Sequence, residues 1–289
     1  MLLVSGASTA SAQSFDLVGV RAQGMAGAFV AVADDASGAW WNPAGLASGA
    51  FSNVTIEYNQ IDDAPANPVG RGVAFGYPAL GLSYYRLPVN QFRLVDPTGT
   101  SVISREDQGV LSQYGLSLGQ SIGGHFVLAS TLKMMRAADT HAEIDVGAMF
   151  TYRMLRAGAT VRNLRQITLT TEHGDTLQLE RQTRAGVALV GHTAGRIESA
   201  TVAVDVDLRA THTFFGEERR VAGGVELWTK GRTIGVRGGL STNTLGDSTS
   251  AASAGLSVAV RSGAYIEGQL TGGSDRSRHG WSSGVRLTF

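Results

Sequence analysis

The sequence has no cysteine and no excess of either charge. The absence of cysteine among 289 residues excludes thiolate catalysis, disulfide bonds and cysteine-ligated zinc. The 24 basic residues balance the 24 acidic ones, so the formal net charge is zero. Because lysine and arginine are scattered rather than clustered, the sequence favours no polyanionic partner and predicts no nucleic-acid binding.

Long hydrophobic runs and prolines are also scarce. After the first dozen residues, no stretch approaches the roughly 18 to 20 continuous apolar residues that a membrane-spanning helix needs. The chain contains only 6 prolines but 38 glycines, which suits many tight turns and bent or closely packed strands. If the protein lies in a membrane, it must therefore span it as a closed β-barrel, in which every backbone polar group is paired.

The beginning of the sequence resembles the end of a secretory signal peptide. Residues 1–12 are apolar or small, and Ala10-Ser11-Ala12 matches the A-x-A pattern that precedes a signal peptidase cut. We expect a mature chain that starts at Gln13. The basic residues that open a signal peptide are missing, so this interpretation places the true start upstream of Met1. The alternative is an ordinary flexible N-terminus.

From about Phe51 onward, short segments carry apolar residues at every second position, which is the period of a β-strand. In Thr201–Arg209 one face consists of valine and leucine, and the other face carries all the charged residues. Glu143–Arg153 repeats this pattern with Met149 as its single lapse. Alternation alone also fits a soluble sandwich, but an apolar face without any charge is what lipid requires.

The connections between these segments alternate between mostly short and mostly longer ones. The expected short connections are Tyr77-Pro78, Ser121–Gly124, Met154-Leu155, Thr193–Glu198, Lys230-Gly231 and Ser262-Gly263. The expected longer connections are Gln60–Val69, Pro88–Asp107, Ala137–Thr140, Arg165–Thr176, Ala210–Glu217, Thr242–Thr249 and Gly272–Arg278. This arrangement, with about fourteen strands, is typical of outer-membrane barrels with tight periplasmic turns and extended outer loops.

The last segment ends in Phe289, with Trp281 and Val285 on the same apolar face. A final strand that ends in phenylalanine resembles the signal read by the outer-membrane barrel assembly machinery. Together with the signal-like start and the alternating connections, it predicts an all-β chain in which residues 50–289 form a closed antiparallel transmembrane barrel. The expected location is the cell outer membrane, with membrane lipid and the barrel assembly machinery as partners.

A barrel of about fourteen strands is too wide for its own side chains to fill, so we expect a plug or a water-filled lumen. The polar faces predict that charges of both signs point into this lumen. These charges are Glu143, Asp145, Asp205, Asp207, Glu226, Glu267, Lys133, Arg153, Arg156, Arg162, Arg184, Arg237, Arg261 and Arg286. Because a buried charge must be paired or hydrated, a ladder of ion pairs is the plainest interpretation, and a dedicated ligand or ion site is the alternative.

Motifs for catalysis or for binding a cofactor are missing. The six histidines fall near strand ends or loops, no pair has metal-ligand spacing, and the HExxH pattern is absent. Gly24–Gly27 lacks the spacing and the lysine of a phosphate-binding loop. We therefore expect no metal, no cofactor and no catalytic residue. The remaining enzyme hypothesis is a site at the outer rim, built from Asp139 and His141 or from His212 and Glu217.

Residues 13–49 lack clean alternation and are long enough to fold back into the lumen. Gly19–Asp35 and the following Trp40-Trp41-Asn42-Pro43-Ala44-Gly45-Leu46 strongly resemble the N-terminal hatch of the FadL superfamily. Within it the sequence is most similar to the PorV/PorQ and UPF0164 group, with supporting similarity at Leu155–Leu164, Gly223–Trp228 and Arg237–Gly239. The resemblance implies a fourteen-strand barrel plugged by this hatch.

Several residues of the hatch motif also have a local interpretation. Asn42 before Pro43 reads as a turn, in which Pro43 restricts φ and Asn42 bonds to its own backbone. Asp34 and Asp35 suit either the start of a helix or an arginine partner in the lumen. The motif residues are Asp34, Asp35, Trp40, Trp41, Asn42, Pro43 and Ala44.

The resemblance implies two functions of different classes. The first is a passive channel that admits hydrophobic or amphipathic small molecules past the hatch and releases them through a lateral gap or a hatch rearrangement. The second is a PorV-like protein that binds or shuttles exported proteins, with a secretion-system protein as its partner. No residue can be assigned to a ligand contact from the sequence.

Overall fold

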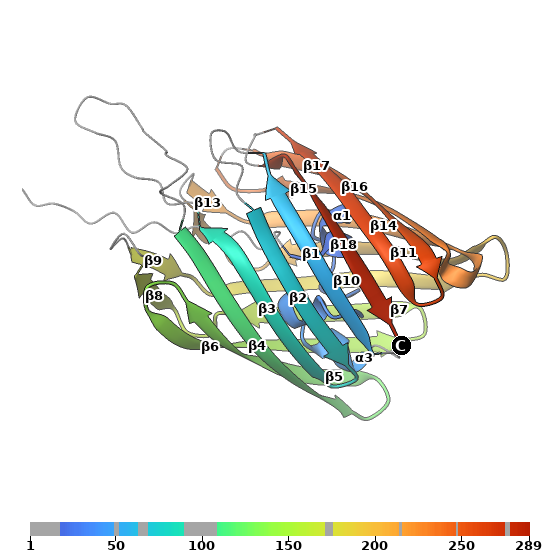
Figure 1. The fold of residues 1–289 in the computed structure, drawn as a ribbon, viewed down its shortest axis with the longest axis horizontal. Coiled ribbons are helices and arrows are strands. Elements are labelled where there is room, and N and C mark those ends of the chain that lie inside the picture. The colour runs from blue at the N-terminus through green and yellow to red at the C-terminus, as the bar shows by residue number, and fades with distance from the viewer. Residues whose placement is uncertain are drawn as a thin grey trace, which may run out of the picture.

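The computed structural model describes residues 18–48, 52–62, 69–89, 109–170, 176–213, 216–246, 248–274 and 278–289. They form a closed antiparallel barrel of 14 strands, in which β1 pairs with β18 to complete the ring (Figure 1). The barrel strands are β1 (Asn53–Ile61), β2 (Val69–Tyr77), β3 (Leu80–Val89), β4 (Gly109–Ile122), β5 (Phe126–Arg136), β6 (Thr140–Tyr152), β7 (Leu155–Arg162), β10 (Gln182–His192), β11 (Ile197–Asp207), β14 (Arg220–Thr229), β15 (Ile234–Asn243), β16 (Ser250–Arg261), β17 (Ala264–Gly273) and β18 (Gly280–Thr288). The predicted fold class and strand number are confirmed.

Short and long connections lie at opposite ends of the barrel, as the sequence predicted. At the short-turn end, two residues join β6 to β7 and two join β16 to β17. The turn from β14 to β15 contains the short helix η2 (Lys230–Arg232). At the long-connection end, two connections carry small hairpins of their own, β8 (Ile167–Thr170) with β9 (Thr176–Leu179) and β12 (Thr211–Thr213) with β13 (Gly216–Glu218).

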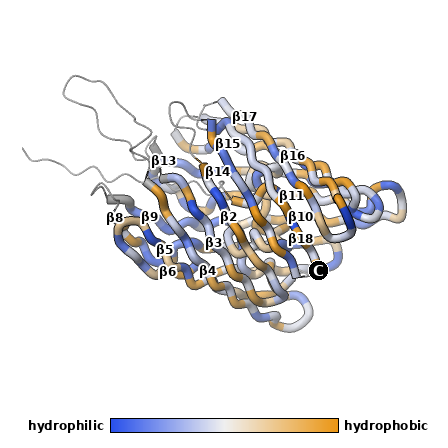
Figure 2. Tube along the Cα trace, viewed as in Figure 1, coloured by the Kyte–Doolittle hydropathy of each residue, from blue (hydrophilic) through white to orange (hydrophobic). Residues whose placement is uncertain are grey.

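The outer wall of the barrel is apolar. On β11, Val202 and Val204 are 53% and 47% exposed, whereas Ala203 between them is 1% exposed. Hydrophobic and hydrophilic residues alternate along the barrel strands in the same way around the ring (Figure 2). Because exposed valine, leucine and isoleucine cover the wall and every wall strand is paired on both sides, this surface is built to face hydrocarbon.

No helix in the described residues is long and apolar enough to cross a membrane.

Residues 18–48, here called the inserted segment, lie inside the barrel (Figure 1). They form three short helices, α1 (Val20–Gly24), α2 (Gly38–Trp41) and α3 (Ala44–Ser48), joined by turns. Helix α1 contacts β15 to β18, and α3 contacts β2 to β6, so the segment reaches across the lumen. Its apolar side chains are almost fully buried and form the main core of the protein with inward residues of the wall. The expected boundaries at residues 12–13 and at residue 49 lie outside the described residues.

The single lapse in the alternation of β6 has a packing reason. Met149 faces inward and is 1% exposed, because it packs against Ala44 of α3 and Val127 of β5. An inward apolar residue is favourable at this position because the inserted segment presents an apolar partner to it. The break in the pattern therefore marks a place where the wall meets the segment rather than water.

Candidate functional site

The lumen, with the inserted segment packed inside it, is the candidate functional site. Glycines on two neighbouring strands let the segment approach the wall closely. A Cβ at Gly158 of β7 would lie 2.5 Å from the carbonyl oxygen of Val30, and a Cβ at Gly147 of β6 would clash with Asn42. Both glycines are thus needed for close packing, which is one of the roles that the abundance of glycine in the sequence suggested.

Asn42 and Pro43 anchor the turn between α2 and α3 to the wall. The Asn42 side-chain oxygen accepts a hydrogen bond from the Ala44 N–H at 3.1 Å, which is the local turn predicted from the sequence. Its amide nitrogen donates to the carbonyl oxygens of Val30 at 2.9 Å and of Ala148 at 3.0 Å. One fully buried side chain therefore joins two parts of the segment to β6.

Arg21 is the centre of the charged contacts between segment and wall. Its Nε and Nη2 donate to the two carboxylate oxygens of Glu226 on β14, both at 2.7 Å. Its Nη1 donates to Asp34 at 2.5 Å and to Asp35 at 3.2 Å. Asp34 in turn accepts from Arg156 of β7 at 3.2 Å. A bidentate arginine–carboxylate pair is both strong and geometrically specific, so it defines where the segment sits.

The sequence left two roles open for the paired aspartates, and the structure assigns both. Asp34 and Asp35 are arginine partners in the lumen. Asp35 also accepts hydrogen bonds from the N–H of Ser37 at 3.0 Å and from its hydroxyl at 2.5 Å, directly before α2 begins. A carboxylate at this place satisfies a backbone donor that the helix leaves free.

The contacts of Glu226 continue along the inner wall. Arg237 of β15 lies 4.0 Å from Glu226 and 3.7 Å from Glu267 of β17. Glu267 also accepts from Arg286 of β18 at 3.0 Å. Arginines and carboxylates therefore alternate across four strands, which keeps this part of the lumen electrically neutral although all of its members are buried.

A second group of charges lies on β5, β6 and β7. Lys133 pairs with Asp145 at 2.7 Å, and Arg162 lies 3.7 Å from the other oxygen of Asp145. The Arg162 guanidinium stands over the ring of Trp40 at 3.7 Å from its centroid, which brings a cation–π contact to the inserted segment. Glu143 accepts hydrogen bonds from the backbone N–H groups of Ile144 and Arg165.

A third group lies on β10 and β11. Arg184 donates to Asp207 at 2.6 Å. Asp205 accepts hydrogen bonds from the N–H groups of Phe29 and Val30, each at 2.8 Å, so it binds the backbone of the inserted segment rather than a basic side chain.

Trp41 is fixed from within the inserted segment, because its ring N–H donates to the Val18 carbonyl oxygen at 2.8 Å.

Two of the expected lumen charges do not lie in the lumen. Arg153 is exposed in the turn between β6 and β7, adopts a left-handed backbone with φ of 55° and stacks on Tyr152. Arg261 is exposed at the end of β16, where the pairing register shifts between Ala259 and Arg261. The prediction was wrong for both because alternation stops where a strand turns or slips.

Sequence reasoning missed Arg21 and Glu57 as contacts of the segment. Glu57 of β1 is buried and accepts a hydrogen bond from the N–H of Gly19 at 2.8 Å. Arg21 could have been found, because it is the only basic residue among residues 18–48, which also contain Asp34 and Asp35. Glu57 carried no such signal, because charges alternate with apolar residues in many strands of this chain.

The hairpin β8–β9 covers the inner wall at the long-connection end. Leu169 and Leu179 of the hairpin are fully buried against the inward residues Leu111 of β4 and Met135 of β5. This small apolar cluster is separate from the core around the inserted segment. The hairpin therefore adds an apolar cluster to the inner wall at this end, apart from the core around the inserted segment.

Asp139, between β5 and β6, holds this hairpin in place. It accepts a hydrogen bond from the Thr170 N–H at 3.0 Å and lies 3.1 Å from the His141 ring. Burial opposes ionisation of the carboxyl, but the hydrogen bonds from His141 and Thr170 outweigh it and lower the pKa of Asp139. The negative charge of Asp139 is thus favoured by the folded hairpin.

The histidine pairs that the enzyme hypothesis required serve as loop contacts. His212 of β12 lies between Glu180 at 3.0 Å and Glu217 at 3.2 Å, and so links the two hairpins of the long-connection end. His173 lies outside the described residues. Within the described part of the chain, no group of three or more histidine, aspartate or glutamate side chains is placed to hold a metal ion.

The fold and this lumen define a transmembrane β-barrel with residues 18–48 packed inside it. In comparisons with solved structures, the chain is similar to the CymD monoaromatic hydrocarbon channel, with 12% identity, a TM-score of 0.65, and coverage of 96% of this chain and 99% of that one. It is similar to the Ralstonia pickettii toluene transporter TbuX, with 11% identity, a TM-score of 0.62, and coverage of 95% and 99%.

A third similar structure is a Pseudomonas aeruginosa FadL homologue, with 11% identity, a TM-score of 0.58, and coverage of 93% and 95%. A family described as "F plasmid transfer operon, TraF, protein" matches residues 108–207, which is less than half of the chain. No curated protein matches the sequence. The chain therefore has the fold of the FadL-type outer-membrane channels over nearly its whole length.

Proposed function

We propose that this protein is a FadL-type channel of the outer membrane, which admits hydrophobic or amphipathic small molecules past the inserted segment. The observation that carries the proposal is a closed fourteen-strand barrel that encloses its own N-terminal residues. The fold shared with channels for monoaromatic hydrocarbons and toluene supports this class of substrate. The residues that act as the hatch in this proposal are those of the inserted segment.

The contents of the lumen favour an apolar substrate over a dissolved ion. The inserted segment packs Phe29, Trp40 and Trp41 inside the barrel, and the hairpin β8–β9 adds apolar side chains at the long-connection end. Apolar molecules can exchange contacts with such side chains, whereas an ion would lose its hydration shell. The described interior is thus suited to passing hydrophobic molecules when the segment moves.

Neither alternative function gains support from the comparisons. The similar structures named above are transport channels, and none of them points to protein shuttling or to catalysis. The similarity to the PorV/PorQ and UPF0164 group therefore stays a prediction.

The proposal is tested by uptake in cells that lack the protein. We expect labelled long-chain fatty acids or alkyl aromatics to enter more slowly in the deletion strain than in the same strain carrying the wild-type gene. Unchanged uptake of every compound would count against a channel. The chain has no cysteine, so an engineered disulfide can also test whether the segment must move.

Ala47 of α3 and Gly119 of β4 offer a suitable pair of positions. A Cβ at Gly119 would lie 3.5 Å from the Ala47 Cβ, within the range that disulfides need. We expect the double variant Ala47→Cys, Gly119→Cys to lose uptake when oxidised and to regain it with a reductant. The single variant Ala47→Cys serves as the matched control. Full uptake by the oxidised double variant would show that this end of the segment does not move.

A further inference from the structure

Three arginines form a row on the outward face of the barrel near its long-connection end. The pairing registers place Arg71 of β2 opposite Arg86 of β3, Arg86 opposite Ser112 of β4, and Ser112 opposite Arg136 of β5. Residues that oppose each other in an antiparallel pair point to the same face, and all three arginines are exposed. Neighbouring strands are about 4.8 Å apart, so the row is roughly 14 Å wide.

This row is unusual because it gathers positive charge on a wall that is otherwise apolar. Like charges directly opposite each other, as Arg71 and Arg86 are, destabilise a sheet unless an anion lies between them. Among the described residues, no carboxylate forms an ion pair with Arg71, Arg86 or Arg136. On the described strands, no other lysine or arginine lies on the outward face in this half of the barrel. Within the described part of the chain, the charges of the row are thus not neutralised by a carboxylate.

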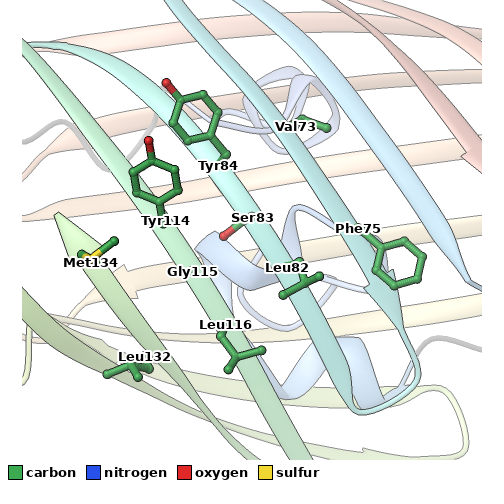
Figure 3. A pocket seen from close by; sticks show the side chains of 10 residues that line it. All are labelled: Val73, Phe75, Leu82, Ser83, Tyr84, Tyr114, Gly115, Leu116, Leu132 and Met134. Atoms are coloured by element: carbon green, nitrogen blue, oxygen red, sulfur yellow. The ribbon is translucent and has the colours of Figure 1, made fainter. Parts of the chain in front are cut away.

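An apolar groove of about 540 Å³ begins directly below the arginine row. Its walls are the next two outward rows of the same four strands, toward the short-turn end. The first row contains Val73, Tyr84, Tyr114 and Met134, and the second contains Phe75, Leu82, Leu116 and Leu132. Ser83 and Gly115, between these outward residues, line its floor (Figure 3).

Aromatic residues in and near the groove indicate at which depth of the membrane it lies. Tyr84 and Tyr114 lie side by side with ring centroids 4.9 Å apart, and both hydroxyls point toward the long-connection end (Figure 3). Next to the row, Arg71 lies 5.8 Å from the ring of Tyr58, which itself packs on Trp281 at 5.4 Å. Tyrosine and tryptophan gather at the level of lipid headgroups, so this is the interface of the leaflet that faces the long connections.

We propose that the arginine row and the groove form a binding site for a phosphorylated glycolipid of the outer leaflet. The arginines bind its phosphate groups, and the groove holds one or more of its acyl chains. Guanidinium groups bind phosphate through paired, charge-assisted hydrogen bonds, and arginines spread over four strands can reach more than one phosphate of a single headgroup. The lipid thereby neutralises the like charges that face each other on β2 and β3.

The site is tested by native mass spectrometry of the purified full-length protein with added lipid A. We expect wild-type protein to retain lipid A through detergent exchange, and the triple variant Arg71→Gln, Arg86→Gln, Arg136→Gln to retain at least tenfold less. The matched control is Arg153→Gln, Arg261→Gln, which removes two exposed arginines at the short-turn end and should retain lipid A as the wild type does. Equal retention by the triple variant would overturn the proposal.

Changing the lipid tests the same site without changing the protein. Lipid A without its phosphates, and lipid A with fewer acyl chains, should each bind wild-type protein at least tenfold more weakly. Displacement of lipid A by an equal concentration of phosphatidylglycerol would overturn specificity for the glycolipid. A wild-type dimer that excludes lipid A and disappears in the triple variant would show that a second copy of the chain covers this face, and would also overturn the proposal.

Discussion

The pair of Arg21 and Glu226 should control how firmly the inserted segment is held. It belongs to a network of four basic and four acidic side chains, six of which are buried. The basic members are Arg21, Arg156, Arg237 and Arg286, and the acidic members are Asp34, Asp35, Glu226 and Glu267. The substitution Glu226→Gln keeps the shape of the side chain but leaves the network with one positive charge in excess.

The size of the effect follows from burial and geometry. The Arg21 and Glu226 side chains are 6% and 1% exposed, and two hydrogen bonds of 2.7 Å join them. Removing one partner of such a buried pair costs about 3 to 5 kcal/mol. Part of this cost is avoided because Arg21 keeps Asp34 and Asp35, so we expect a loss near 3 kcal/mol. At 1.4 kcal/mol per tenfold, opening of the segment should become about a hundredfold more frequent.

Amide hydrogen exchange of the inserted segment measures this opening directly. We expect Glu226→Gln and Arg21→Gln each to speed exchange in α1 and α2, while exchange in β5 and β6, far from the pair, stays unchanged. The double variant restores neutrality, so its effect should be smaller than the sum of the two single effects by at least about 1.5 kcal/mol. Unchanged exchange in both single variants, or strictly additive effects, would refute this account of the pair.

Two further predictions concern close packing and pH. Gly158→Ala should destabilise the folded barrel to urea by about 1 to 3 kcal/mol, because its Cβ would lie 2.5 Å from the Val30 carbonyl oxygen. The control Gly223→Ala, whose Cβ would meet no atom within 4 Å, should have no more than a small effect. The pKa of Asp139 is lowered in the folded state, so its contribution is complete above the ordinary aspartate pKa and is lost as pH falls through the lowered value. The protection of the β8 amides, taken relative to their intrinsic exchange rate at each pH, should therefore fall in acid in the wild type. Asp139→Asn should lose that pH dependence and be less protected than the wild type at neutral pH.

The barrel could be predicted from the amino-acid sequence, because a strand has a period of two and lipid tolerates no charge on the outward face of a strand. The alternation along Thr201–Arg209 placed Asp205 and Asp207 on the inward face, and the structure places both there. The lengths of the connections predicted that short and longer ones alternate around the ring, and the arrangement as a whole predicted about fourteen strands. These properties are local, since each depends on a few consecutive residues.

The contacts across the lumen, in contrast, became visible only in the folded barrel. Asp205 was grouped with the charges of an ion-pair ladder but binds the backbone of Phe29 and Val30. Alternation likewise assigned Arg153 to the lumen, although a turn places it outside. Arg21 and Glu226 are 205 positions apart in the chain. Their pairing depends on closure of the ring and on how the inserted segment fills it, and a pattern of period two contains no information about either.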